Sequence, residues 1–411
     1  MTGYTEIKSC RVTKEQDLVT VLDVGHQKLT GVFPRPDQEV GVGPLNLVWS
    51  PSSCLVQLKH TYEPTEMYGD NYGYLSSLNN SMVQHLNQKA KYLTDLANLQ
   101  DGDVVVDIGS NDCTFLKALP TYTKRIGIDP TIKKFAHYYP EEIYYAADFF
   151  SKENYWLIES EKNAKLVTSI SCFYDLDDPV SFVKDIREIL TDDGLWHFEQ
   201  AYLPSTLRAT SYDTVCHEHI EYYSMLSVRK ILDLAGMKIV DVTLNDINGG
   251  SFAVTACKDT NKDIPVNSAV IDWLIEEEYK MGLDTLDPYL QFAERANAHR
   301  DSLVSLLRGL REAGKSVYGY GASTKGNVLL QWCGLTSKDI TAFGEINPDK
   351  YGCVTPGTNI PIISETEVKA AKPDYMIVLP WHFKPGILQR EKEYRNAGGK
   401  FIFPLPYIEI V

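Results

Sequence analysis

The sequence contains no apolar run of 18 residues, so we expect no membrane-spanning helix and no membrane partner. The first six residues lack the apolar core that a signal peptide needs. Basic residues are also few, with 40 Lys and Arg against 55 Asp and Glu and a net charge of −15. Because binding to nucleic-acid phosphates requires a basic surface, this balance argues against a nucleic-acid partner.

Paired cysteines are absent as well. The eight cysteines are scattered, and no two are spaced as C-x-x-C. We therefore expect a reduced, cytoplasmic setting in which most thiols are small buried side chains. At 411 residues the chain is too long for one hydrophobic core, and two or three domains are expected.

Four stretches differ in their pattern. Residues 1–65 hold short β-rich runs separated by Pro and Gly, which predicts a small N-terminal β domain. Residues 66–260 alternate strand and helix, which is typical of a doubly wound α/β sheet with ligands at the carboxyl ends of its strands. Residues 261–313 are mostly helical and suit a connection. Residues 314–411 repeat the alternation, which predicts a second, smaller α/β domain.

The most informative stretch is residues 104–116, VVVDIGSNDCTFL. A β-branched run ends in Asp107, turns at Gly109 and leads into a helix start. Such a junction presents free backbone N–H groups, and Gly109 lets a ligand come close. Taken alone, an ordinary strand–turn–helix without a ligand would be the better interpretation.

Acidic residues at the ends of the following strands change that balance. Asp129 follows Asp107 by 22 residues, and Asp148 ends the next predicted strand. A dinucleotide fold would need G-x-G-x-x-G, whereas this loop has a single glycine and no basic residue. Three strand-end acids suit a ligand with a ribose and a positive centre but no phosphates. S-adenosylmethionine has these features, so the pattern resembles class I methyltransferases and favours them over nicotinamide enzymes.

A second cluster, residues 211–224 (SYDTVCHEHIEYYS), places two histidines around a glutamate. H-x-H with an acid can bind a metal, although the usual H-E-x-x-H zinc spacing is absent. A histidine of near-neutral pKa can also remove a proton, with a carboxylate or tyrosine orienting it. The alternative is that these residues form a polar contact between parts of the fold, with their hydrogen bonds made inside the protein and no ligand bound. Residues 66–77, rich in aromatic and hydroxyl groups, suit either a pocket for a polyhydroxylated ligand or a domain seam.

These motifs together resemble a known family. MYGDNYGYLSSLNNSM, VVVDIGSNDCTFL, YDTVCHEHIEYYS, NDINGGSF, VYGYGASTKGNVLLQ and GEINPDKYGCVTPGTNIPI occur in the order found in three-domain sugar C-methyltransferases. Those enzymes use S-adenosylmethionine and act on nucleotide-linked 4-keto deoxysugars. The resemblance implies a class I methyltransferase Rossmann-like domain flanked by the small N-terminal β domain and the C-terminal α/β domain.

The resemblance also implies roles for individual residues. His219 would be the general base that forms an enolate, with further catalytic candidates Glu218, His217, Tyr72 and Tyr74. The S-adenosylmethionine site would place Asp107 and Gly109 at the methionine part, Asp129 at the ribose and Asp148 with Phe149 at the adenine, with Asn111 and Ser171 as further candidates.

The nucleotide-sugar substrate would be held partly by the C-terminal domain. The amides of residues 319–321 and the charge of Lys325 are expected to approach a pyrophosphate. The full set of substrate-binding candidates is Tyr222, Asn248, Gly321, Ser323, Lys325, Asn327 and Glu345. We expect a monomer or a homodimer.

The chain departs from the family in its cysteines. The family's N-terminal domain holds zinc through two C-x-x-C pairs, but only Cys10 and Cys54 stand at expected places here, so we predict no metal. Cys113 occupies a position that is commonly glycine, and Cys216 one that is commonly tyrosine. Neither cysteine has an evident role.

Three other functions remain open. The nearest is O-methylation of a sugar hydroxyl, in which His219 would deprotonate an alcohol. The others are a sugar-nucleotide binding protein that has lost its activity and a nicotinamide oxidoreductase.

Overall fold

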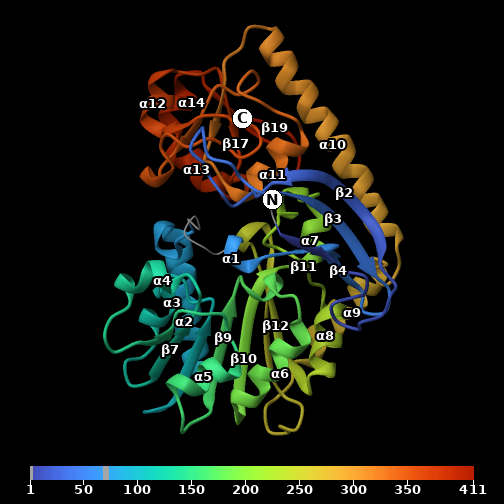
Figure 1. The fold of residues 1–411 in the computed structure, drawn as a ribbon, viewed down its shortest axis with the longest axis vertical. Helices are drawn as coiled ribbons and strands as arrows, with labels where there is room; N and C mark the ends of the chain where they lie inside the picture. The colour runs from blue at the N-terminus through green and yellow to red at the C-terminus, as the bar shows by residue number, and fades with distance from the viewer. Residues whose placement is uncertain (1–2, 68–73) are drawn as a thin grey trace.

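The computed structural model describes residues 3–67 and 74–411 (Figure 1). Its largest sheet has seven strands in the order β12-β13-β10-β9-β6-β7-β8. Strands β6 to β10 run parallel, while β13 is antiparallel to both β10 and β12. The strands are β6 (Val104–Ile108), β7 (Lys124–Ile128), β8 (Tyr144–Ala146), β9 (Ala164–Ile170), β10 (Leu190–Ala201), β12 (Met237–Asn245) and β13 (Ser251–Lys258).

Helices cover both faces of this sheet, and the sequence pattern explains why. All five residues of β6 are buried, as expected for a central parallel strand. The predicted helix near residues 81–99 is present as α2, and it begins where the Asn79 side chain accepts a hydrogen bond from the Ser81 amide. The helices are α2 (Asn80–Leu96), α3 (Thr114–Ala118), α4 (Ile132–Phe135), α5 (Lys152–Ile158), α6 (Pro179–Ile189), α7 (Leu203–Arg208) and α8 (Met225–Leu234).

The N-terminal region forms an antiparallel sheet that recruits a distant strand. Its order is β11-β4-β3-β2, and β11 comes from the middle of the chain, within the predicted cluster at 211–224 and just after its two histidines. A separate pair joins β1 to β5. The elements are β1 (Tyr4–Glu6), β2 (Val19–Lys28), β3 (Val42–Ser50), β4 (Leu55–Leu58), β5 (His60–Tyr62), α1 (Pro64–Met67) and β11 (Glu221–Tyr222).

The C-terminal region is a second α/β unit with a six-stranded sheet in the order β16-β15-β14-β17-β18-β19. All its strands are parallel except β19. The elements are β14 (Val317–Tyr320), α11 (Thr324–Trp332), β15 (Phe343–Glu345), β16 (Ile362–Ser364), α12 (Glu365–Ala370), β17 (Tyr375–Val378), α13 (Lys384–Arg390), α14 (Lys392–Asn396), β18 (Lys400–Phe403) and β19 (Glu409–Ile410). The predicted fold class is thereby confirmed.

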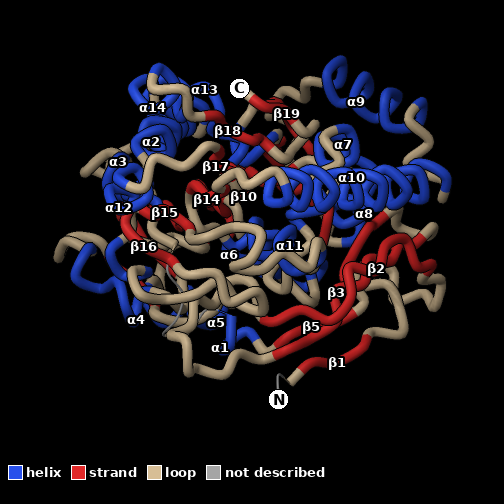
Figure 2. Tube along the Cα trace, turned by 90° about the horizontal axis from the view of Figure 1, so that it is seen from above, coloured by secondary structure: helices blue, strands red, loops and turns tan. Residues whose placement is uncertain are grey.

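Two helices, α9 (Ser268–Lys280) and α10 (Asp287–Glu312), lead from one α/β unit to the other. With 26 residues, α10 is about 39 Å long, and both views show it running beside β2 (Figures 1 and 2). The Tyr289 ring lies 5.5 Å from that of Trp49, and Arg295 Nη2 donates to the Leu207 carbonyl at 2.8 Å. The helix therefore braces the N-terminal sheet and α7 together. Within the described residues, no helix is both long and apolar enough to cross a membrane.

Candidate active site

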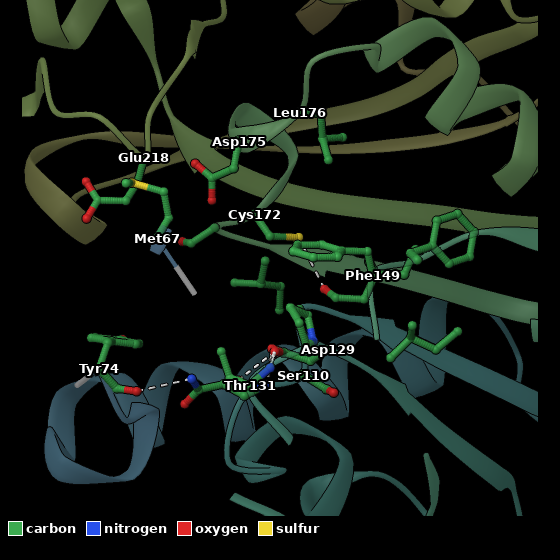
Figure 3. Close-up of a pocket in the computed structure, with 18 of the residues that line it drawn as sticks. Met67, Tyr74, Ser110, Asp129, Thr131, Phe149, Cys172, Asp175, Leu176 and Glu218 are labelled. Carbon is green, nitrogen blue, oxygen red and sulfur yellow. Dashed lines mark hydrogen bonds between the residues drawn. The ribbon is translucent and has the colours of Figure 1, made fainter. Parts of the chain in front are cut away.

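A cavity of about 280 Å³ opens at the carboxyl ends of β6, β7 and β9, where ligands of open α/β sheets bind. Figure 3 shows Ser110, Asp129 and Thr131 on one wall, with Asp175 and Glu218 across from them. The loops after β6, β7, β8 and β9, residues of the segment 61–67 and residues of the segment 217–220 thus converge on one space.

Gly109 forms the turn after β6. Its φ is +74°, and a Cβ added there would lie 2.9 Å from the Cβ of Cys172. A side chain is therefore excluded both by the left-handed backbone and by the neighbouring loop. Gly109 thus forms a turn without a side chain on the cavity wall, which we call the glycine cradle.

Asp107 ends β6 and is buried, with 4% of its surface exposed. Thr168 Oγ1 donates to its Oδ1 at 2.7 Å. Burial raises the pKa of Asp107 to about 7, against the lowering effect of the Thr168 hydrogen bond and with a smaller contribution from the Asp129 charge. A buried acid with such a pKa is poised to ionise when a cation enters the cavity.

Asp129 ends β7 and orders the glycine loop. Its Oδ2 accepts from the Asn111 amide at 2.8 Å, and its Oδ1 accepts from the amide and hydroxyl of Thr131, each at 2.6 Å. Burial raises the pKa of Asp129, and these hydrogen bonds act against that rise. Asn111 (φ +49°) also donates through Nδ2 to the Tyr74 carbonyl at 3.2 Å (Figure 3).

Of the remaining cofactor candidates, Phe149 and Ser171 line the cavity and Asp148 does not. Phe149 lines the cavity and keeps 40% of its surface exposed. Asp148 is exposed, accepts from the Phe149 amide at 2.8 Å, and is not among the described residues that line the cavity. Ser171 lines the cavity at φ +58°, and its amide donates to the Glu199 carbonyl at 2.7 Å.

The CHEH stretch sends its side chains in different directions. His217 is buried, with Nδ1 3.3 Å from Thr30 Oγ1 and Nε2 3.4 Å from the Gly43 carbonyl oxygen. Burial lowers the pKa of His217 to about 4. His217 lies on the cavity wall. Its ring nitrogens are hydrogen-bonded to the N-terminal module, here defined as residues 3–67.

Glu218 also lines the cavity. Burial raises its pKa, against hydrogen bonds with its own backbone, the Cys216 thiol and the Thr30 hydroxyl. In residues 3–67 and 74–411, its Oε2 has no hydrogen-bond partner. A buried carboxylate oxygen left free in this way is available to a ligand.

His219 is partly buried and lines a separate small space of about 10 Å³, and it is not among the described residues that line the main cavity. Its ring packs edge-on against Tyr174 at 4.4 Å, and its Nδ1 lies 3.3 Å from the Thr214 carbonyl oxygen. Burial, followed by the Lys325 charge, lowers the pKa of His219 to about 3. The imidazole is thus neutral at neutral pH, and burial together with the Lys325 charge disfavours its protonated form.

The tyrosine candidates are spread out. Tyr74 lines the cavity with 49% of its surface exposed, whereas Tyr72 lies outside the described residues. Tyr222 is buried and donates to the Thr214 carbonyl at 3.1 Å, beside His219.

The amides of the C-terminal glycine loop, residues 319–321, were expected to approach a pyrophosphate, and this expectation is wrong. The amides of Gly319 and Gly321 donate to the carbonyls of Ala342 and Gly344 at 2.8 Å, so they are part of the sheet and do not face a phosphate. A Cβ at Gly319 would lie 2.0 Å from the Phe343 ring, which explains that glycine by packing. Donors for an anion would instead come from the start of α11.

Other C-terminal candidates are engaged inside the protein. Ser323 caps α11 by accepting from the Gly326 amide at 3.1 Å, and Lys325 Nζ donates to the Asn248 carbonyl at 3.4 Å. Glu345 accepts three backbone N–H groups, from residues 322, 346 and 347. Asn327 is fully buried and donates to the Thr30 carbonyl at 2.7 Å.

The place expected for zinc is filled with hydroxyl groups. Cys10 Sγ lies 3.1 Å from Ser53 Oγ, and Thr13 Oγ1 lies 2.6 Å from Ser52 Oγ. Ser50 Oγ donates to an Asp17 carboxylate oxygen at 2.8 Å and lies 3.1 Å from Ser52 Oγ. One thiol and several neutral hydroxyls that bond to one another do not form a zinc donor set.

Cys54 does not complete that set either, although it stands at a place expected for a family cysteine. Ser53 takes the place beside Cys10, while burial and then the charges of Asp284 and Glu278 raise the pKa of Cys54 to about 11. Among the described residues, no three His, Cys, Asp or Glu side chains are grouped so that they could hold a metal.

The two unexplained cysteines are both fully buried. Cys113 has φ +67°, which accounts for a position where glycine is common. Cys216 lies against Glu218.

Sequence reasoning missed several cavity residues. Cys172 and Asp175 line it, and their signal was available because they directly follow β9. Met67, within the stretch 66–77 predicted to form a pocket or a domain seam, also lines it, as does Tyr62, which no local pattern marks. The N-terminal module reaches the site only through tertiary contacts.

The sheet order, the glycine cradle and the strand-end acids define a class I S-adenosylmethionine-dependent methyltransferase. Three family descriptions match the chain: "Putative zinc binding domain" over residues 10–68, "Methyltransferase domain" over 82–242, and "C-methyltransferase C-terminal domain" over 246–406. C-methyltransferase NovU of Streptomyces niveus is 32% identical over 411 residues, covering 98% of this chain and 97% of the relative. The chain therefore belongs to this family of C-methyltransferases.

Solved methyltransferase structures are similar over less than half of this chain. An S-adenosylmethionine-dependent methyltransferase from Clostridium acetobutylicum is 12% identical, with a TM-score of 0.34, and the match covers 43% of this chain and 92% of that one. The plantazolicin methyltransferase BpumL, solved with SAH, is 10% identical with a TM-score of 0.34, covering 42% of this chain and 82% of that one.

Proposed function

We propose that this enzyme transfers a methyl group to a carbon of a nucleotide-linked keto deoxysugar through an enolate formed by a base. The observation that carries the proposal is the placement of Glu218 on the cavity wall opposite Asp129, with His219 next in sequence and neutral. The Glu218 carboxylate thus lies on the cavity predicted for the methyl donor, and His219 follows it on the same loop. The name of the NovU relative supports methylation at carbon.

The cavity suits S-adenosylmethionine, because Gly109 presents a turn without a side chain to the cavity and Asp107 can ionise beside a cation. When bound, this cofactor supplies an electrophilic methyl carbon on a sulfonium. We assign Asp107, Gly109 and Asn111 to its methionine part and Asp129 to its ribose. The adenine would lie on the rim at Phe149, with Asp148 and Ser171 nearby.

His219 then removes the proton from the carbon beside the keto group. The imidazolium that forms is disfavoured by burial, and the negative enolate beside it offsets that cost. Glu218 orients the substrate or the base, with Tyr74 on the same cavity. Lys325 and the first turn of α11 would meet the diphosphate, since both lie on the His219 side of the site.

The decisive experiment is a mass-spectrometric assay with S-adenosylmethionine and a panel of nucleotide-linked 4-keto sugars. We expect a product heavier by one methylene, and a loss of at least about 10³-fold in His219→Asn with S-adenosylhomocysteine binding unchanged. Full activity in His219→Asn would reject the base assignment.

Deuterium exchange separates methylation at carbon from methylation at oxygen. With cofactor omitted, a carbon base exchanges the hydrogen beside the ketone, and His219→Asn stops this exchange. No exchange in wild type together with methyl transfer would favour a sugar hydroxyl as the acceptor. Binding of S-adenosylhomocysteine without turnover on any sugar would indicate a binding protein. We expect a cytoplasmic monomer or homodimer without nucleic-acid partners.

A further inference from the structure

The loop that carries Glu218 and His219 is attached to the N-terminal module. Strand β11 follows this loop and pairs antiparallel with β4. The amide of Leu58 donates to the Ile220 carbonyl at 2.8 Å, which extends the pairing into the loop itself. The position of the catalytic loop is therefore set by a domain that contributes no strand to the methyltransferase sheet.

Thr30 and Gly31, which follow β2, lie between this loop and the C-terminal domain. Thr30 is fully buried, and its hydroxyl lies 3.3 Å from His217 Nδ1. Its carbonyl accepts from Asn327 Nδ2 at 2.7 Å, and Asn327 belongs to α11. Thr30, which belongs to the N-terminal module, is thus hydrogen-bonded to the loop at 217–219 on one side and to the C-terminal domain on the other.

Gly31 meets the carboxylate of Glu218 directly. A Cβ at this position would lie 2.0 Å from Oε1 and 3.2 Å from Cδ. The backbone of Gly31 is outside the left-handed region, so the chain conformation would accept alanine. Glycine is therefore needed at position 31 to leave room for the Glu218 carboxylate, and not because the backbone conformation requires it.

We propose that Gly31 is a positioning residue that fixes where the Glu218 carboxylate lies in the active site. An alanine would have to push Oε1 from 2.0 Å to the ordinary contact of 3.4 Å. Displacing a catalytic carboxylate by more than about 1 Å costs on the order of 10²-fold in rate. Because Oε1 is the end of a flexible side chain, it can move without unfolding the protein. This inference rests on the proposed function of Glu218.

The test compares Gly31→Ala with Gly309→Ala. Gly309 lies on α10, and a Cβ there meets nothing within 4 Å. For Gly31→Ala we expect kcat to fall between about tenfold and about 100-fold, with the melting temperature and S-adenosylhomocysteine affinity unchanged. Gly309→Ala keeps the wild-type kcat and S-adenosylhomocysteine affinity, and its melting temperature rises slightly because alanine is the better helix former. Crystal structures of wild type and Gly31→Ala are expected to show the Glu218 carboxylate displaced.

A double-mutant cycle separates this role from a general structural one. In the Glu218→Asp background, adding Gly31→Ala should cost less than about threefold, because the shorter carboxylate no longer meets the Cβ. An equal loss in both backgrounds, or wild-type kcat with an unmoved carboxylate, would overturn the inference. Absence of turnover in wild type would instead reject the proposed function, and the crystal structures would still decide the position of Glu218.

Discussion

Asp107 leads to a prediction whose size follows from its surroundings. Its buried carboxyl has a pKa of about 7, so at about pH 6 roughly nine-tenths of the free protein carries it protonated. The cationic methionine part of S-adenosylmethionine favours the ionised form, so binding must release the proton. We predict that affinity rises about tenfold from about pH 6 to about pH 8, as the ionised fraction grows from about a tenth to about nine-tenths.

Isothermal titration of S-adenosylmethionine across this range measures the effect, with Asp107→Asn as the matched control. Asparagine stays neutral and still accepts from Thr168. The cofactor's own amino group titrates near pH 8 in both proteins and therefore cancels in the comparison. The same pH dependence in wild type and Asp107→Asn would refute the reasoning.

The raised pKa of Asp107 also predicts how the stability of the free protein changes with pH. The folded pKa of Asp107 is raised above its ordinary value of 3.8. Its contribution to stability is therefore complete below about pH 4 and is lost as the pH rises to about 7. Relative to wild type, Asp107→Asn should gain melting temperature across that window, and a constant difference would contradict this.

Two further predictions concern the base and the hydroxyl cluster. Because the pKa of His219 is lowered to about 3, kcat at saturating cofactor should show no acid limb near pH 6.5; a limb there would contradict a neutral, desolvated base. The triple variant T13C/S50C/S53C, together with Cys10, should recreate a four-thiolate site and bind one equivalent of zinc by elemental analysis, whereas wild type binds none. Zinc in wild type, or none in the variant, would show that the cluster is described wrongly.

The local pattern was sufficient for much of the fold. The β-branched run at 104–108 predicted a buried central strand because a parallel strand covered on both faces needs apolar residues throughout. Gly109, Asp107 and Asp129 could be found because the carboxyl ends of parallel strands meet at one edge, whatever the details of packing. The prediction that the amides of residues 319–321 approach a pyrophosphate was wrong, since the amides of Gly319 and Gly321 are hydrogen-bonded within the sheet.

Several features were decided by tertiary structure alone. No local pattern shows that β11 joins the N-terminal sheet, that Ser53 rather than Cys54 faces Cys10, or that Gly31 touches Glu218. These contacts join residues far apart in sequence, so they depend on how whole domains pack. The sequence by itself determined the elements, the cofactor edge and the residue types of the base loop, because these follow from periodicity and chemistry. The folded chain decided where the base loop lies, because that position is set by the N-terminal module.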